Sequence, residues 1–211
     1  MVIVDSYLAT AAVASGLLRD PSLARRWDDP SALDGFAVSG LAGHLAGNVS
    51  NVESFLDAPP LAGVEATDVV RYYLDGSDPD TPVDDPIKLR IRSRASQRAL
   101  IGPLALAEEF DAALSRLAPR LAGLDPSLNV PMFGRFVLPL DQCLIWGMLE
   151  FVVHIDDLSV SLEVPAPAIP EEAADLVVVA LARIALGRRG LPPVLRALSR
   201  RERATDLATA F

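Results

Sequence analysis

The sequence predicts an all-α fold, a bundle of packed helices. Hydrophobic residues make up 51 % of the 211-residue chain, whereas aromatic residues make up only 6 %. Ala and Leu are abundant, and this balance favours packed helices over a sheet. The longest apolar segment, 176–186, is interrupted by Arg183 and is too short to cross a membrane. We therefore expect one domain, 1–211, with a sizeable helical core.

Capping and breaking residues divide the first half of the chain. A first helix is expected from Val4 to Arg19, where Asp20-Pro21 ends it. A second helix begins near Val38, with Ser39 as its N-cap, and runs to about Leu56. A short helix over 64–75 precedes a polar loop, 75–82. We interpret this loop as a surface loop, since neither side alone has enough amphipathic helices for its own core.

The second half contains four further helical stretches. Asp85-Pro86 begins a helix that runs from Ile87 to about Leu121 and kinks or breaks at Gly102-Pro103. Segment 123–136 is expected to be irregular, with 133–138 as a short extended piece. Pro139 opens a helix over 140–162. The chain ends with an apolar helix over 171–187 and a basic helix over 193–203.

Charge and cysteine content exclude several classes of protein. The formal net charge is -9, and Lys88 is the single lysine. An acidic chain without a basic stripe argues against nucleic acid and anionic membranes as partners. The single cysteine, Cys143, excludes an intramolecular disulfide. Residues 7–18 resemble a signal peptide only superficially, because Asp5 stands where its basic region should be, so we expect a cytoplasmic protein.

A carboxylate and an imidazole lie four residues apart in the helix over 140–162. This spacing places Glu150 and His154 on one face of the helix, about one turn apart. The chain has two histidines, and the other, His44, lies in the apolar second helix. We predict that the two helices pack together and that His44, Glu150 and His154 hold one divalent metal. Such a ligand set suits a catalytic zinc with a further position open to water or substrate.

An alternative is a hydrogen-bonded polar pair in the bundle core. Glu–His pairs at this spacing also occur on helix surfaces. The apolar surroundings favour burial, and a buried carboxylate needs a partner that no nearby Lys or Arg supplies to Glu150. Asp157, one turn after His154, either orients the second ring nitrogen of that histidine or is a surface carboxylate. Cys143, on the same stripe, is expected to be packed in the core.

Several other residues are candidates for contact with a ligand. Asn48 and Asn51 share the face of His44, and Trp146 precedes Glu150 by one turn; we expect these three to contact a cofactor. Apolar walls would come from Trp27, Phe36, Phe133 and Trp146. Gly40, Gly43 and Gly47 either allow close approach of another helix or a ligand, or mark a frayed helix. The arginines at 90, 92, 94 and 98 form a solvated face, or else one of them pairs with an anionic ligand.

Three segments resemble a known family. Residues 41–46 (LAGHLA) and 150–158 (EFVVHIDDL) resemble the two metal motifs of the mycothiol-dependent maleylpyruvate isomerase family, and residues 194–203 (VLRALSRRER) resemble family endings. The similarity spans roughly residues 5–205. It implies a DinB/YfiT-like four-helix bundle, with additional short helices, in which His44, Glu150 and His154 bind zinc or another divalent metal such as Ni²⁺. Mycothiol would be the thiol cosubstrate.

The expected function follows from this resemblance with one departure. The isomerase itself carries a second, C-terminal domain, for which the sequence has no room before Phe211. We therefore expect transfer of a low-molecular-weight thiol to a small electrophile instead of isomerisation. The alternative is a non-catalytic metal-binding bundle that serves as a dimerisation or small-molecule-binding module. A homodimer is one arrangement that the helices over 171–187 and 193–203 would allow.

Overall fold

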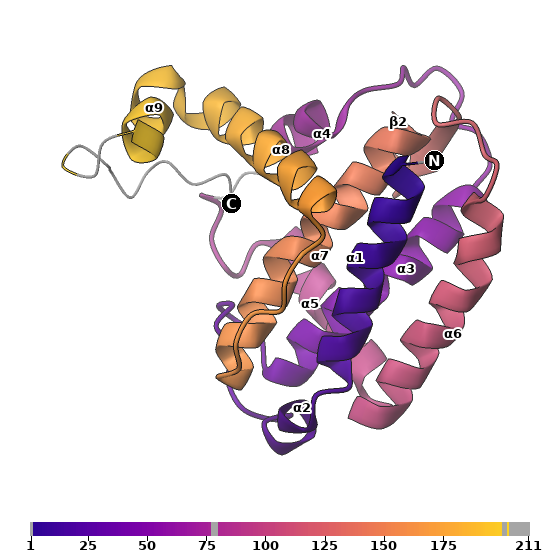
Figure 1. The fold of residues 1–211 in the computed structure, drawn as a ribbon. Coiled ribbons are helices and arrows are strands. Elements are labelled where there is room, and N and C mark those ends of the chain that lie inside the picture. Colours follow the sequence, from indigo (N-terminus) through magenta and orange to yellow (C-terminus); the bar gives the residue numbers. More distant parts are fainter. Residues whose placement is uncertain (1, 77–79, 200–201, 203–211) are drawn as a thin grey trace.

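Four long helices surround one core in the computed structural model, which describes residues 2–76, 80–199 and 202 (Figure 1). They are α1 (Val2–Leu18), α3 (Val38–Leu56), α6 (Pro103–Leu121) and α7 (Leu140–Leu162). Helices α6 and α7 each pack against both α1 and α3. The predicted all-α fold with a DinB-like four-helix bundle is confirmed. Among the described residues, no helix is long and apolar enough to cross a membrane.

Asp-Pro and Gly-Pro pairs set several helix ends. Asp20 caps α2 (Pro21–Arg25) by accepting a hydrogen bond from the Ser22 amide. Asp85 accepts one from the Ile87 amide at the start of α5 (Pro86–Ala99). Gly102 has a positive φ of 86°, which favours glycine, and separates α5 from α6. The predicted break at Gly102-Pro103 is therefore confirmed.

The start of α3 corrects one expectation. The N-cap is Ala37 and makes no side-chain cap, whereas Ser39 lies inside the helix. The amides of Val38 and Ser39 instead donate to the carbonyls of Asp29 and Trp27, each at 2.8 Å. The preceding loop thus satisfies the free amides that a capping side chain would otherwise serve.

A two-stranded hairpin connects α6 to α7. Strand β1 (Asn129–Met132) pairs antiparallel with β2 (Phe136–Pro139), in register from Asn129–Pro139 to Met132–Phe136. The extended segment was expected over 133–138, with irregular chain before it. Phe133 and Gly134 instead form the turn, with φ of 54° and 67°. Strand β1, whose last three residues are buried, was therefore not predicted.

The short helix α4 (Val69–Gly76) begins later than the expected residue 64. The segment before it is extended: Ala66 forms a bridge with Val137, and the Thr67 amide donates to the Val137 carbonyl at 2.9 Å. Pairing with the hairpin thus competes with helix formation here. After α7, α8 (Glu171–Arg189) packs on α7, α4 and α1, and α9 (Leu191–Ser199) follows it. The final basic helix starts two residues earlier than expected, and part of its predicted end lies outside the described residues.

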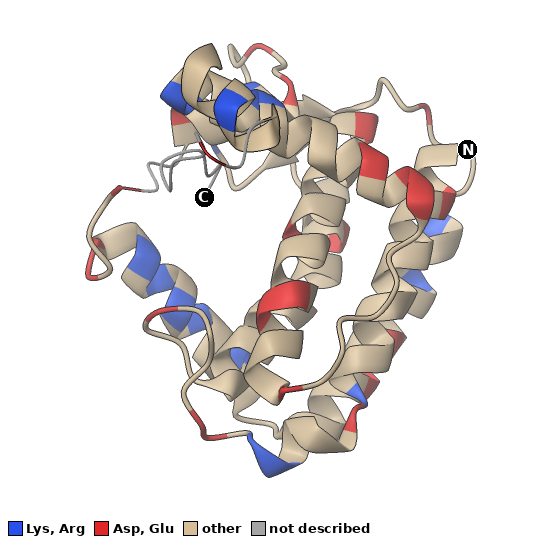
Figure 2. Ribbon diagram, turned by 60° about the vertical axis from the view of Figure 1, so that its left-hand side comes forward, with Lys and Arg blue, Asp and Glu red and all other residues tan. Residues whose placement is uncertain are grey.

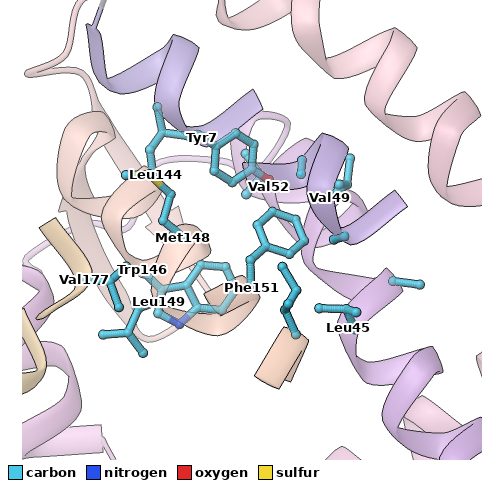
Figure 3. Close-up of a cluster of buried hydrophobic side chains, with 14 of the residues drawn as sticks. Tyr7, Leu45, Val49, Val52, Leu144, Trp146, Met148, Leu149, Phe151 and Val177 are labelled. Atoms are coloured by element: carbon cyan, nitrogen blue, oxygen red, sulfur yellow. The ribbon is translucent and has the colours of Figure 1, made fainter. Parts of the chain in front are cut away.

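The core lies where α1, α3 and α7 meet. Tyr7, Leu45, Val49 and Phe151 pack there with almost no exposed surface (Figure 3). Cys143 is fully buried, as expected for a packing residue, and burial raises the pKa of its thiol to about 12.

Two glycines of α3 allow α5 to approach it closely. A Cβ at Gly43 would overlap the Ala95 carbonyl oxygen, and one at Gly47 would overlap the Arg98 guanidinium. The expectation that these glycines permit close approach of another helix is confirmed.

Candidate metal centre

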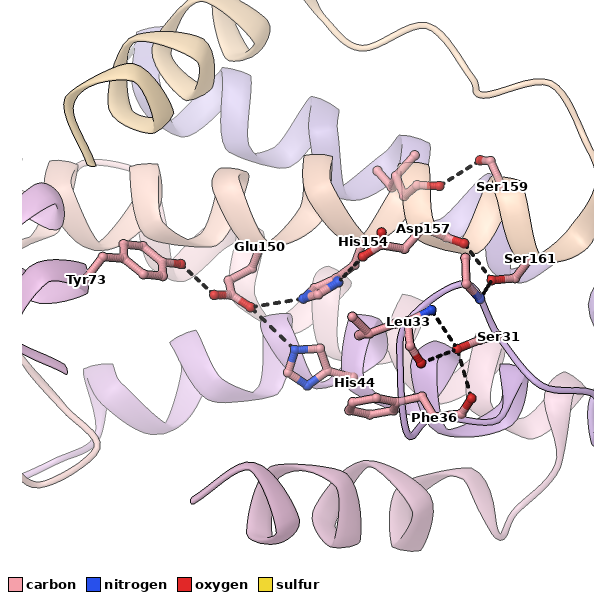
Figure 4. Close-up of polar contacts among 12 residues, drawn as sticks. Ser31, Leu33, Phe36, His44, Tyr73, Glu150, His154, Asp157, Ser159 and Ser161 are labelled. Carbon is pink, nitrogen blue, oxygen red and sulfur yellow. Dashed lines mark hydrogen bonds and ion pairs between the residues drawn. The ribbon is translucent and has the colours of Figure 1, made fainter. Parts of the chain in front are cut away.

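Helices α3 and α7 bring the three predicted ligand residues together (Figure 4). Nε2 of His44 and Nε2 of His154 each lie 3.5 Å from the same oxygen of Glu150, Oε2. One possible ligand atom from each residue lies within 4.8 Å of the other two. His44 and Glu150 are far apart in the sequence, so packing of α3 against α7 creates the cluster.

The donor set and spacing fit a divalent metal. Zinc binds imidazole nitrogen and carboxylate oxygen at about 2.0–2.2 Å, which puts neighbouring tetrahedral ligands about 3.3 Å apart. The two nitrogen–oxygen distances of 3.5 Å are close to that spacing. The side chains of the three residues are 15–25 % exposed, so solvent reaches them. Three protein ligands and solvent access leave room for a further, exchangeable ligand.

Glu150 is held by groups on both of its oxygens. The Tyr73 hydroxyl, from α4, donates a hydrogen bond of 2.5 Å to Oε1, while Oε2 faces the two imidazoles. Burial alone would raise the pKa of Glu150, but hydrogen bonds from His154 and His44 outweigh it and hold that pKa well below its usual range. The carboxylate is therefore ionised and partnered without a Lys or Arg. Tyr73 was not predicted as a site residue, because no local sequence pattern connects it with Glu150, 77 residues away.

Asp157 lies against the other ring nitrogen of His154. Its Oδ2 is 2.9 Å from His154 Nδ1, the distance of a hydrogen bond. Burial would lower the pKa of His154, but the bonds with Asp157 and Glu150 outweigh it and raise that pKa to about 9. When Nε2 loses its proton, the proton that remains at Nδ1 leaves the Nε2 lone pair directed at the cluster. Asp157 thus lies where a residue that orients this histidine is needed.

His44 has a different environment. Its ring packs against Phe36 and lies edge-on to His154, with ring centroids 5.9 and 4.6 Å apart. Burial lowers the pKa of His44 from its usual value. The imidazole is therefore neutral at neutral pH, as a metal ligand must be.

Several aromatic side chains lie near the start of α7, one turn before Glu150. Trp146 lies 5.7 Å from Phe55 and 5.6 Å from Phe133, between ring centroids, and Tyr72 stacks on Phe133 at 6.5 Å. We call Phe55, Tyr72, Phe133 and Trp146 the aromatic cluster. Phe133 is 47 % exposed, so the cluster reaches the surface. Of the predicted apolar walls, Phe133 and Trp146 come together here, Phe36 contacts His44, and Trp27 is half-buried before α3.

The other candidate residues have varied positions. The Asn48 side chain is buried, donates to the Gly147 carbonyl at 2.8 Å and accepts from the Tyr7 hydroxyl at 3.3 Å, so it joins α3 to α7 and α1. Asn51 is half-buried. Binding of a cofactor by Asn48, Asn51 and Trp146 stays a prediction.

The arginines of α5 divide into two groups. Arg90 and Arg94 are exposed, as expected of a solvated face, and Figure 2 shows the basic residues along this helix. Arg98 is half-buried and donates to the Gly43 carbonyl at 3.3 Å. The arginine that turns inward thus contacts the backbone of α3 beside His44.

Comparison with known proteins identifies the family of this chain. Residues 8–159 match the family model described as the mycothiol maleylpyruvate isomerase N-terminal domain. A solved structure, "Crystal structure of the mycothiol-dependent maleylpyruvate isomerase", superposes with a TM-score of 0.53 at 18 % sequence identity, over 86 % of this chain and 69 % of the other. No curated protein sequence matches the chain. Since the family match covers most of the chain, including His44, Glu150 and His154, the protein belongs to the mycothiol maleylpyruvate isomerase N-terminal domain family.

Proposed function

We propose that this protein activates a low-molecular-weight thiol, mycothiol, at a divalent metal held by His44, Glu150 and His154, and transfers it to a small electrophile. The convergence of two imidazoles and one ionised carboxylate at a solvent-accessible point carries the proposal. Membership of the family supports mycothiol as the thiol. Zinc suits the nitrogen and oxygen donors, and Ni²⁺ is an alternative.

The chemistry needs a thiolate, because the thiolate is the nucleophile and a free thiol is mostly protonated at neutral pH. A divalent ion bound by two neutral imidazoles and one carboxylate supplies a net positive charge that favours the thiolate. The protein's own residues keep the ligands ready: Asp157 orients His154, and Tyr73 holds Glu150. Burial keeps His44 neutral.

The aromatic cluster suits an apolar electrophile. Its rings exclude water from the start of α7, one turn before Glu150, and Phe133 is exposed enough to contact a ligand. In the transfer, sulfur supplies the electron pair of the new S–C bond, the leaving group departs with the pair of the broken bond, and the thiol proton goes to solvent.

A non-catalytic binding module is the second candidate. The observation in its favour is that Tyr73 and Asp157 already bond the cluster side chains, so the network is also suited to a structural role. Here a metal would stabilise the packing of α3 on α7 without turnover.

The test has two parts. Elemental analysis of the purified chain should find about one divalent metal per chain, and His44→Ala or His154→Ala should remove it. Next, maleylpyruvate and a bimane or chlorinated aromatic electrophile are each assayed with mycothiol and metal. We expect transfer to the electrophile, abolished in His44→Ala. Isomerisation of maleylpyruvate without thiol transfer would show that the protein is an isomerase and not a transferase. Bound metal with neither activity would favour the binding module. Unchanged metal content in both histidine variants would refute the site.

A further inference from the structure

Helix α8 has an apolar stripe on the face that points away from the bundle. Its inner face buries Ala173, Val177, Ala180 and Ile184. On the outer face, Val178 is 62 % exposed, Val179 51 % and Leu186 36 %. Val178 and Val179 are adjacent, and Leu186 follows them by eight and seven residues, which is about two helical turns. With Ala182 one turn after the valines, these side chains lie on one helical face. Single exposed apolar residues are common, but a continuous stripe marks a contact surface.

The charges beside this stripe change sign along the helix. Glu171, Glu172 and Asp175 lie at its start, and Arg183 follows the valines; Figure 2 shows the acidic and basic ends of α8. Asp175 and Arg183 are both exposed, and no salt bridge of either is found among residues 2–76 and 80–199. They are eight residues apart, too far to pair along one helix.

We propose that α8 is the interface of a symmetric homodimer, in which it packs antiparallel against α8 of a second copy. In a dimer with two-fold symmetry, the same patch of each subunit meets at the interface, so that patch must be complementary to itself. With the axis near Val179, Asp175 lies four residues before the centre and Arg183 four residues after it. Asp175 of one chain then faces Arg183 of the partner subunit, and the pair occurs twice. The exposed valines meet at the centre, where the interface is driest.

The opposite orientation fits less well. In a parallel pair with matched registers, Asp175 would face Asp175 of the partner subunit, and Arg183 would face its own counterpart. Like charges in register are unfavourable, so the charge pattern selects the antiparallel arrangement. Helix α8 has 19 residues, about 28 Å at 1.5 Å per residue. An interface made by one face of one helix buries an area at the small end of the range for stable complexes, so the dimer should dissociate on dilution.

The first test compares two matched variants of the full chain. Val178 and Val160 are both exposed valines on helices, at 62 % and 59 %, but Val160 lies on α7, away from the stripe. Light scattering after size exclusion, over a dilution series, should give twice the chain mass of 22.5 kDa for wild type and Val160→Glu at high concentration. Val178→Glu should remain at the mass of one chain, with unchanged circular dichroism. A single-chain mass for wild type at every concentration would overturn the proposal.

The second test uses the charges and remains decisive if Val178→Glu fails to fold. Asp175→Arg or Arg183→Glu alone should weaken the dimer by roughly tenfold or more, because each leaves like charges opposed twice. The double variant Asp175→Arg/Arg183→Glu restores both pairs with inverted sign and should recover the wild-type dissociation constant. Single variants that dimerise like wild type, or a double variant weaker than both, would exclude the antiparallel pairing. If a different protein occupied the stripe, the double variant would not rescue self-association.

Discussion

Tyr73 and Glu150 form a 2.5 Å hydrogen bond that divides the two oxygens of the carboxylate between two tasks. Oε1 accepts from the tyrosine hydroxyl, and Oε2 lies 3.5 Å from Nε2 of both histidines. Such a bond favours a carboxylate that offers one oxygen to a metal and keeps its orientation before the metal binds. It also links α4 to the centre, since Tyr73 is the α4 residue that reaches Glu150.

Tyr73→Phe should therefore weaken metal binding by about tenfold, because Glu150 loses the group that fixes its orientation. Calorimetric titration of the metal-free protein measures the change. Tyr7→Phe is the control: it also removes a buried tyrosine hydroxyl, but one that bonds Asn48 and no metal ligand. That variant should lose about 1 kcal/mol of stability and keep its metal affinity. Equal affinities in both variants would show that Tyr73 has no part in holding Glu150.

Asp157→Asn should reduce metal affinity by about 10- to 100-fold, since the bond to His154 Nδ1 would lose its charge. Asp156→Asn is a matched control on the adjacent residue, whose side chain is exposed. Competition with a chromogenic chelator compares the two variants directly. If Asp157→Asn bound metal as tightly as Asp156→Asn, Asp157 would be a helix-surface carboxylate only.

Metal affinity should rise with pH and level off near pH 9. The pKa of His154 is raised to about 9, so a metal that binds below this pH must displace a proton. The apparent affinity then increases by up to about tenfold per pH unit until His154 is neutral. Glu150 and His44 add nothing near neutral pH, because the pKa of each is lowered and both are already deprotonated.

Calorimetry at about pH 7.5, in buffers of different ionisation enthalpy, should therefore report about one proton released per metal. In the metal-free protein, the pH dependence of the free energy of unfolding has the opposite sign: stability falls as the pH rises. A folded pKa raised above that of the unfolded chain gives stabilisation that is complete below pH 6.5 and lost as the pH rises through about 9. Binding without proton release would contradict the bonding proposed for His154.

The elements predicted correctly are those fixed by local chemistry. Asp85-Pro86 and Gly102-Pro103 act through their own backbone and caps, so the helix start and the break follow from the sequence. The errors arise where distant segments meet. Ala66 pairs with Val137 in place of a helix turn, and Ser39 needs no capping role because loop carbonyls accept the first amides of α3.

The candidate site shows the same division. His44, Glu150 and His154 were identifiable because the chain has only two histidines, in apolar helices, and one has a carboxylate at helical spacing. Asp157 was identifiable because it follows His154 by three residues, which is also a helical spacing. Tyr73 was not, because its contact with Glu150 depends on how α4 packs against α7 and α8.

Helix α5 packs closely on α3 at Gly43. Gly43→Ala should lower the free energy of unfolding by about 1–3 kcal/mol, because the new methyl group meets the backbone carbonyl of Ala95, which cannot rotate away. Gly16→Ala is the control within a helix: nothing lies within 4 Å of its Cβ position, so it should gain about 0.5–1 kcal/mol from helix propensity. Urea unfolding of the two variants gives the comparison. Since His44 adjoins Gly43, displacement of α3 should also weaken metal binding in Gly43→Ala alone. If Gly43→Ala proved as stable as Gly16→Ala, close contact of the two helices at Gly43 would not be needed for the fold.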